Sequence, residues 1–234
     1  MKRITDFIFE GLFLKKTPRS GFAFLGRGRE SVAEHSFGAT FIAYVLGQLA
    51  RLGGKEVDLE KLLTLTLFHD LAEARTGDLN YVNKRYLVNR EDLATNDALD
   101  SLPFRDALLS LREEWIENKT LEARLSRDAD QLDMLVELKK HEAEGSPSAG
   151  EWIEYCRLRL KTDVGLKVLE SILESRPDDW WFAKKEEYWV DPKGPEPPRE
   201  TAPDGAPSAT GKPAPATQSA AEKPGSGDPD KGGN

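Results

Sequence analysis

Residues 62–75 of the chain read LLTLTLFHDLAEAR. This segment contains no Gly or Pro and is almost wholly apolar before its histidine, which indicates a buried helix. The apolar run ends in an imidazole and two carboxylates, those of His69, Asp70 and Glu73. Because buried ionisable groups are costly unless they are paired or bound to a metal, these three side chains require partners from elsewhere in the chain.

The composition of the 234 residues excludes several classes of protein. Charged residues make up 32% of the chain and the formal net charge is -8, which argues against general binding to nucleic acid or to an anionic membrane. The single cysteine, Cys156, cannot form an intramolecular disulfide and fits a reducing compartment. No segment approaches the roughly 18–20 apolar residues of a membrane helix, and residues 1–6 are too polar for a signal peptide. We therefore expect a soluble cytoplasmic protein with no membrane partner.

Two helix starts are marked by local capping patterns. Ser31 is followed three residues later by Glu34, which is the pattern of a capping box, so a helix is expected to begin there and to carry His35 in its second turn. Asp58 is suited to the N-cap of the helix that carries the His-Asp pair. That second helix is expected to run without a break as far as Gly77.

The remaining chain predicts more helices and no convincing strand. Amphipathic spacing predicts helices over four further ranges: 4–14, 103–115, 120–144 and 151–173. The aromatic residues 180–182 are expected to pack on the core of this all-α body, which we place at residues 1–190. Residues 191–234 contain no Val, Ile, Leu, Met or aromatic residue and hold ten of the fourteen prolines, so we expect a disordered tail.

The histidines suggest a metal site, although each has an ordinary explanation. His35 and His69 lie among apolar residues of expected helices, and together with Asp70 and one later Asp they would form a mixed nitrogen and oxygen ligand set. Such a set suits Mn, Fe, Co or Zn. Taken alone, a helical histidine is more often a hydrogen-bonded core residue, and Asp70 could pair with an arginine. The third histidine, His141, follows two lysines near a polar helix end and is expected to be exposed to solvent.

Other carboxylates could join or assist this site. Glu73 follows His69 by four residues and therefore shares its helix face, where a carboxylate could take a proton from an attacking water. Asp78, just beyond the expected helix end, could do the same or hold a substrate. Asp128 and Asp130 are two residues apart and point about 200° away from each other on a helix. Only one of them can face the histidines, and the spacing alone does not decide which.

The sequence motifs around these residues resemble those of the HD-domain metal-dependent phosphohydrolases. The resemblance rests on PRSGF at 18–22, ESVAEHS at 30–36, HDLAE at 69–73, TGD at 76–78 and DADQL at 128–132. It is similar in particular to the branch that contains the bacterial 5'-deoxynucleotidases and their eukaryotic HD-domain-containing relatives, and it covers roughly residues 5–185. It implies an all-α HD-domain helical bundle.

The resemblance also implies a ligand set. It assigns one divalent metal ion, of Mn, Co, Fe or Zn, to His35, His69, Asp70 and Asp130. Asp130 matches the ligand position of the family, so Asp128 would be an outer-face or salt-bridge residue. One tightly held ion is expected because only one histidine is left over.

Catalytic and substrate-binding roles follow from the same resemblance. Glu73 would be the catalytic carboxylate near the nucleophilic water, and Asp78 would lie near the sugar or the leaving oxygen of the substrate. Arg19 matches the arginine that contacts phosphate. Phe22 stands where the family often has Trp, which would alter contacts to the sugar or base.

The implied activity is the hydrolysis of deoxynucleoside 5'-monophosphates to deoxynucleosides and phosphate. One alternative is a deoxynucleoside triphosphate triphosphohydrolase, for which a basic entrance made by Lys15, Lys16, Arg27 and Arg29 would be the distinguishing feature. Another is a non-catalytic metal- or nucleotide-binding scaffold, against which the presence of Glu73 and Asp78 argues. A small-molecule nucleotide is the expected partner. A homodimer is also expected, because relatives of this type are commonly dimers and the last helices offer apolar surface.

Overall fold

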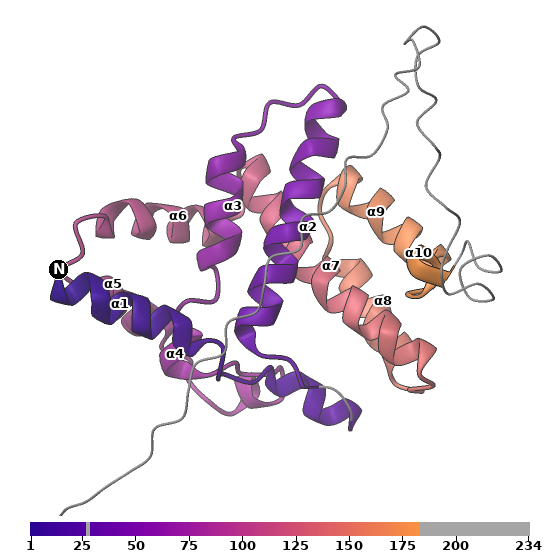
Figure 1. Ribbon diagram of the computed structural model, residues 1–234, viewed down its shortest axis with the longest axis horizontal. Helices are drawn as coiled ribbons and strands as arrows, with labels where there is room; N and C mark the ends of the chain where they lie inside the picture. Colours follow the sequence, from indigo (N-terminus) through magenta and orange to yellow (C-terminus); the bar gives the residue numbers. More distant parts are fainter. Residues whose placement is uncertain (27–28, 183–234) are drawn as a thin grey trace, which may run out of the picture. The chain divides into compact units, whose positions relative to one another are not determined.

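The computed structural model describes residues 1–26 and 29–182 (Figure 1). Within these residues the protein is all-α, as expected, and the only strand-like feature is an isolated bridge between Pro18 and Ser31. Helices are α1 (Lys2–Phe13), α2 (Val32–Leu52), α3 (Leu59–Phe68), α4 (Glu73–Thr76), α5 (Glu91–Leu99), α6 (Arg105–Glu117), α7 (Leu121–Ala143), α8 (Ala149–Arg159), α9 (Asp163–Glu174) and α10 (Asp179–Phe182), with 3-10 turns η1 (Ser20–Leu25) and η2 (Asn83–Arg85). The expected tail at 191–234, the domain end at 190 and Arg27 lie outside the described residues.

Both helix starts that the sequence marks are present. The hydroxyl of Ser31 accepts a hydrogen bond from the backbone N–H of Glu34 at 3.2 Å, and the Glu34 carboxylate accepts one from the N–H of Ser31 at 2.7 Å. The carboxylate of Asp58 accepts a hydrogen bond from the N–H of Lys61 at 3.0 Å. These caps satisfy N–H groups that a helix cannot pair internally, so the starts of α2 and α3 are fixed by local sequence.

The core lies where α2, α3 and α7 pack against one another, with α8 packed on α7 (Figure 1). Leucines from all three central helices are fully buried there, among them Leu46, Leu62 and Leu132. At Gly47 of α2 an added Cβ would lie 2.6 Å from a methyl carbon of Leu59, so this glycine permits the close approach of α2 and α3. A smaller apolar cluster joins α1 to the segment after α3. No helix in the described ranges combines the length and hydropathy that a membrane span requires. The cytoplasmic location stays a prediction.

The helix expected over residues 58–77 is broken, and this prediction was wrong in its second half. Helix α3 ends at Phe68 and α4 begins at Glu73. In between, the backbone makes tighter bonds that span three residues, from the N–H of Leu71 to the carbonyl of Phe68 and from the N–H of Glu73 to that of Asp70. These tighter bonds replace the α-helical pattern at the His-Asp pair, so that pair lies just beyond a helix end rather than inside a helix.

The helix expected over residues 151–173 is also two helices, because a remote carboxylate interrupts it. Asp128 of α7 is fully buried and accepts hydrogen bonds from the N–H of Lys161 at 2.7 Å, the N–H of Thr162 at 2.8 Å and the hydroxyl of Thr162 at 2.6 Å. The Thr162 hydroxyl in turn accepts from the N–H of Gly165 and caps α9. The prediction that Asp128 is an outer-face or salt-bridge residue was therefore wrong.

Two further predictions about burial were wrong. His141 is buried rather than exposed, since its ring packs against Phe22 with centroids 5.6 Å apart. Trp180, expected to pack on the core, is 87% exposed in the short helix α10. Charged neighbours such as the two lysines before His141 therefore say little about the burial of one residue on a long helix.

Candidate active site

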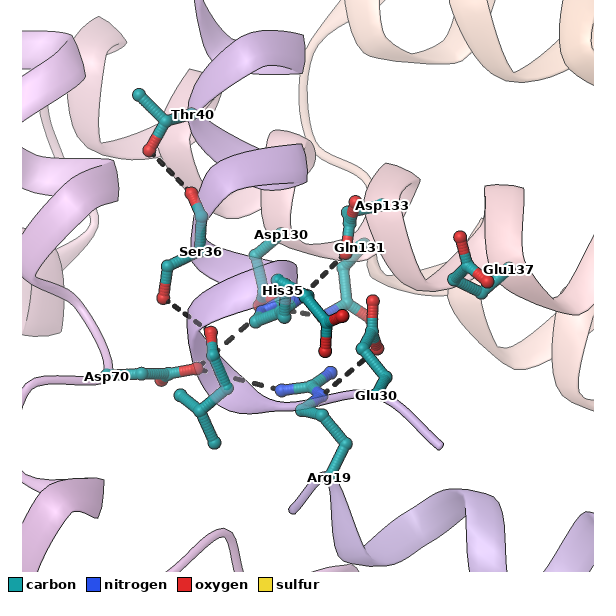
Figure 2. Close-up of polar contacts among 12 residues, drawn as sticks. Arg19, Glu30, His35, Ser36, Thr40, Asp70, Asp130, Gln131, Asp133 and Glu137 are labelled. Carbon is teal, nitrogen blue, oxygen red and sulfur yellow. Dashed lines mark hydrogen bonds and ion pairs between the residues drawn. The ribbon is translucent and has the colours of Figure 1, made fainter. Parts of the chain in front are cut away.

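Three separate elements bring the four predicted metal-binding residues together, and Figure 2 labels three of the four, His35, Asp70 and Asp130. His35 comes from the first turns of α2, His69 and Asp70 from the turn after α3, and Asp130 from the middle of α7. The Nε2 atom of His35 lies 3.2 Å from Oδ1 of Asp130 and 3.6 Å from Oδ2 of Asp70. The same Asp70 oxygen lies 3.1 Å from Nε2 of His69. The break after α3 makes this possible, because consecutive residues of a continuous helix point about 100° apart.

The two imidazoles present unpaired nitrogen atoms to the carboxylates. Nδ1 of His35 lies 2.6 Å from the Asp133 carboxylate, and Nδ1 of His69 lies 2.6 Å from the carbonyl of Thr66. Both Nε2 atoms are buried and have no hydrogen-bond partner among the described residues. If each Nδ1 carries the proton, each Nε2 offers a lone pair, and two such nitrogens beside two carboxylates suit a divalent transition metal. The residues present therefore fit the implied metal ion.

The protonation of the cluster reflects the concentration of negative charge. Burial alone would raise the pKa of Asp130, but its contacts with His35 and the nearby His69 and Arg19 hold it well below its usual range. Burial would lower the pKa of His35, but its close contacts with the carboxylates of Asp130 and Asp133 raise it to about 10. The pKa of His69 is likewise raised by Asp70. In the metal-free protein, protons on the histidines thus supply the positive charge that the carboxylates require.

Arg19 adds a fixed positive charge at the edge of this cluster. Its side chain is buried, with Nη1 3.6 Å from Oδ2 of Asp70 and Nε 3.8 Å from Oε2 of Glu30 (Figure 2). Burial opposes the charge of the guanidinium, but Asp70 and Asp130 raise the pKa of Arg19 further. A guanidinium held in one place by carboxylates has the geometry to bind a phosphate oxygen.

A cavity of about 640 Å³ opens over this cluster. Seven of the predicted site residues border it: Arg19, Phe22, His69, Asp70, Glu73, Asp78 and Asp130. His35 is fully buried beneath it. The volume lies in the range of sites for small organic ligands, roughly 300–1,000 Å³.

The far wall of the cavity was not found from the sequence. It is formed in part by Trp152, Tyr155 and Arg159 of α8, together with Tyr81 and Lys84 from the segment before α5. The α8 residues are three and seven positions apart and so share one helix face. That spacing of aromatic and cationic residues is a signal that the sequence did contain.

Glu73, Asp78 and Phe22 occupy different environments. Glu73 is buried, one of its oxygens has no hydrogen-bond partner in the described ranges, and burial raises its pKa to about 9 with help from Asp70 and Asp78. Asp78 accepts a hydrogen bond from the N–H of Ser20 at 2.7 Å, which ties it to the start of η1. Phe22 is buried against His141 and borders the cavity with little exposed surface.

These features define an all-helical protein with a candidate site for a divalent metal at the base of a small-molecule cavity. The sequence profile of the HD domain family matches residues 13–167, and the chain belongs to this family. The resemblance inferred from the sequence is confirmed.

Relatives with assigned names are distant and match part of the chain. The 5'-deoxynucleotidase HDDC2 of Danio rerio is 29% identical over 141 residues, 57% of this chain and 68% of that protein. The human 5'-deoxynucleotidase HDDC2 is 27% identical over 135 residues, 55% of this chain and 63% of its own length. The 4'-phosphooxetanocin A phosphatase of Priestia megaterium is 32% identical over 111 residues, 44% of this chain and 55% of that protein. The matched segments thus span between about half and two thirds of these relatives.

Solved structures agree with the fold. A conserved hypothetical protein from Pyrococcus furiosus superposes with a TM-score of 0.62 at 31% identity, covering 73% of this chain and 99% of its own. A predicted metal-dependent phosphohydrolase from Magnetospirillum magnetotacticum gives a TM-score of 0.59 at 21% identity, covering 74% and 90%. The second likeness is one of fold alone.

Proposed function

We propose that this HD-domain phosphohydrolase uses one divalent metal ion to remove the phosphate from deoxynucleoside 5'-monophosphates. The observation that carries the proposal is the pair of buried, unpaired Nε2 atoms beside Asp70 and Asp130, at the base of a cavity with Arg19 in its wall. The relatives named 5'-deoxynucleotidase support the choice of substrate. The ion is Mn, Co, Fe or Zn, in keeping with the nitrogen and oxygen donors.

His35, His69, Asp70 and Asp130 would hold the ion. When bound, it supplies Lewis-acid stabilisation of the charge that develops on the phosphoryl group. Arg19 binds and orients a phosphate oxygen, so that the phosphorus faces the attacking water.

Glu73 is the proposed proton acceptor. Its unpaired carboxylate oxygen orients the water and takes its proton as the water oxygen attacks phosphorus and the bond to the 5'-oxygen breaks. The leaving 5'-oxygen takes a proton from solvent water and departs as the hydroxyl group of the deoxynucleoside. The pKa of Glu73 near 9 belongs to the protein without a cation, and positive charge beside Asp70 would favour its ionised form. Asp78, with one oxygen engaged by Ser20, is proposed to contact the sugar with the other.

The basic entrance expected of a triphosphohydrolase is not part of the cavity wall in the described residues. Lys15, Lys16 and Arg29 do not border the cavity, whereas Arg19 does. Lys84 and Arg159 also border the cavity, but in the described ranges Arg19 is the cation of this wall that pairs with a candidate metal ligand, Asp70. The choice of the monophosphate therefore rests on the relatives named 5'-deoxynucleotidase and not on the charge of the cavity wall.

The test is an activity panel of deoxynucleoside mono- and triphosphates, each with Mn, Co, Fe(II) and Zn. Free phosphate released from monophosphates supports the proposal. Tripolyphosphate released from triphosphates would transfer support to the triphosphohydrolase. No turnover by metal-loaded protein would favour the non-catalytic scaffold. A Glu73→Gln variant is the matched control, because it should keep the metal and lose turnover.

We also propose that two copies associate through α2. The following residues form an exposed apolar stripe along that helix: Phe37, Phe41, Tyr44, Val45, Leu49 and Leu52. Residues 36–50 contain no charged side chain, so this face can cover itself without burying charge. Sedimentation of the wild type and of Phe41→Glu tests the idea. A dimer that the substitution dissociates supports it, and a wild type that is monomeric at all concentrations refutes it.

A further inference from the structure

The carboxylate of Asp133 contacts the ring nitrogen of His35 that faces away from the other candidate metal ligands. Its Oδ2 atom lies 2.6 Å from Nδ1 of His35, which is fully buried (Figure 2). We propose that Asp133 is a positioning residue that holds the proton of His35 on Nδ1 and fixes the plane of the ring, so that Nε2 points at the metal with its lone pair free. The inference rests on the proposed metal centre, because Asp133 can have this role only if His35 is a metal ligand.

The chemistry of a neutral imidazole supports this role. One nitrogen carries the proton and the other accepts, and the hydrogen bond at one nitrogen determines the state of the other. An ionised carboxylate cannot donate, so Nδ1 of His35 must do so. His69 is oriented differently, by the backbone carbonyl of Thr66. A carboxylate partner makes the imidazole a stronger donor to a cation than a carbonyl partner does.

A glycine in helix α2 leaves room for the Asp133 carboxylate. Gly38 lies one turn after His35, and a Cβ added there would overlap Oδ1 of Asp133. Gly in the interior of a helix costs about 1 kcal/mol relative to Ala. The space needed by Asp133 gives a physical reason for a glycine at this position of a 21-residue helix.

The neighbouring Glu30 raises the alternative of a second metal site. Oxygens of Glu30 and Asp133 and a nitrogen of His35 lie within 4.8 Å of one another. The nearest nitrogen is Nδ1, which is already engaged by Asp133 at 2.6 Å, while the Glu30 carboxylate lies 3.8 Å from Arg19. A hydrogen-bonded pair uses the atoms that a second cation would need, so we assign Asp133 to positioning.

The experiment compares Asp133→Asn, Gly38→Ala and a matched control, Glu137→Gln. Glu137 is a carboxylate one turn further along α7, and it pairs with Lys140 rather than with His35. The readouts are the dissociation constant for Co(II) or Mn(II), measured in competition with a chromophoric chelator, and the visible spectrum of the Co(II)-loaded protein. We expect Asp133→Asn to weaken binding by about 10–100-fold and to change the spectrum. Gly38→Ala should do the same by displacing the carboxylate, and Glu137→Gln should do neither.

Combining the two substitutions separates positioning from general damage. If both act through one hydrogen bond, the double variant should bind little more weakly than either single variant, whereas independent effects would multiply and overturn the inference. Circular dichroism identifies a variant that fails to fold, and Gly38→Ala, with its higher helix propensity, then carries the test alone. Unchanged affinity and spectrum in folded Asp133→Asn overturns the inference but leaves the proposed function intact. A wild type that binds no divalent ion removes the proposed function itself.

Discussion

Replacing Asp128 with Ala is expected to destabilise the fold by about 4 kcal/mol while leaving metal binding in place. The buried carboxylate accepts three hydrogen bonds, from two backbone N–H groups and one hydroxyl at the junction of α8 and α9. Hydrogen bonds to charged groups contribute roughly 1.5–3 kcal/mol each, and the burial of the carboxylate offsets part of their sum. The substitution also leaves the N–H groups of Lys161 and Thr162 without an acceptor.

This magnitude can be measured directly. Thermal unfolding of the metal-free protein should shift down by about 8–16 °C, because 1 kcal/mol corresponds to about 2–4 °C in a domain of this size. Denaturant titration should show a lower midpoint with an unchanged slope. Thr162→Val is a matched partial change that removes one of the three bonds and the cap of α9, and it should cost less than Asp128→Ala.

The neighbouring Asp130 should behave in the opposite way. Asp130→Asn should fold and should lose the metal-dependent rise in unfolding temperature, because Asp130 faces the histidines. A decrease below 1 kcal/mol in the Asp128 variant, or loss of its metal binding, would refute the assignment of Asp128 to the helix junction. Full metal content in the Asp130 variant would refute the proposed ligand set.

Three further predictions concern protons. Metal binding should tighten as pH rises from 6 to 9 and should release protons, because a cation must displace the proton from His35, whose pKa is raised to about 10. Calorimetry in two buffers measures the proton release, and a metal affinity independent of pH would contradict the prediction. The metal-free protein should lose stability as pH rises from about 4.5 to 10, measurable as a falling unfolding temperature. The pKa values of Glu30 and Glu73 are raised to about 7 and about 9, so both favour the fold fully at low pH and lose that contribution as they ionise. Glu73→Gln should lower kcat by about 10²–10⁴-fold in steady-state assays and should retain metal affinity. The same substitution should reduce the loss of stability of the metal-free protein with rising pH. Unchanged kcat would exclude Glu73 as the proton acceptor.

Features set by neighbours in sequence could be predicted. The starts of α2 and α3 depend on Ser31 and Asp58, whose side chains bond within three residues of themselves. The order of the motifs was also sufficient to identify the family, and with it the residues that α2, the turn after α3, and α7 bring together.

Features set by remote partners could not be predicted in the same way. The helix at 151–173 has no Pro and a single Gly, and only the Asp128 carboxylate arriving from α7 shows why it breaks at Thr162. Asp133 was also missed, although it follows Asp130 by three residues and so lies near it on the helix. Periodicity identifies the face of a helix, but it does not show which nitrogen of a histidine a carboxylate on that face will meet.

The turn at His69 and Asp70 has a consequence for how a cation enters and leaves. The two proposed donors His69 and Asp70 are consecutive residues, so they would act as one chelating unit whose shape is set by a single turn of backbone. The other two proposed donors lie on α2 and α7, which the apolar core already holds against each other. Folding therefore assembles the donors before any ion arrives, and exchange of one ion for another requires no unfolding. Which metal the protein carries should then follow the supply of ions around it more than the history of its folding.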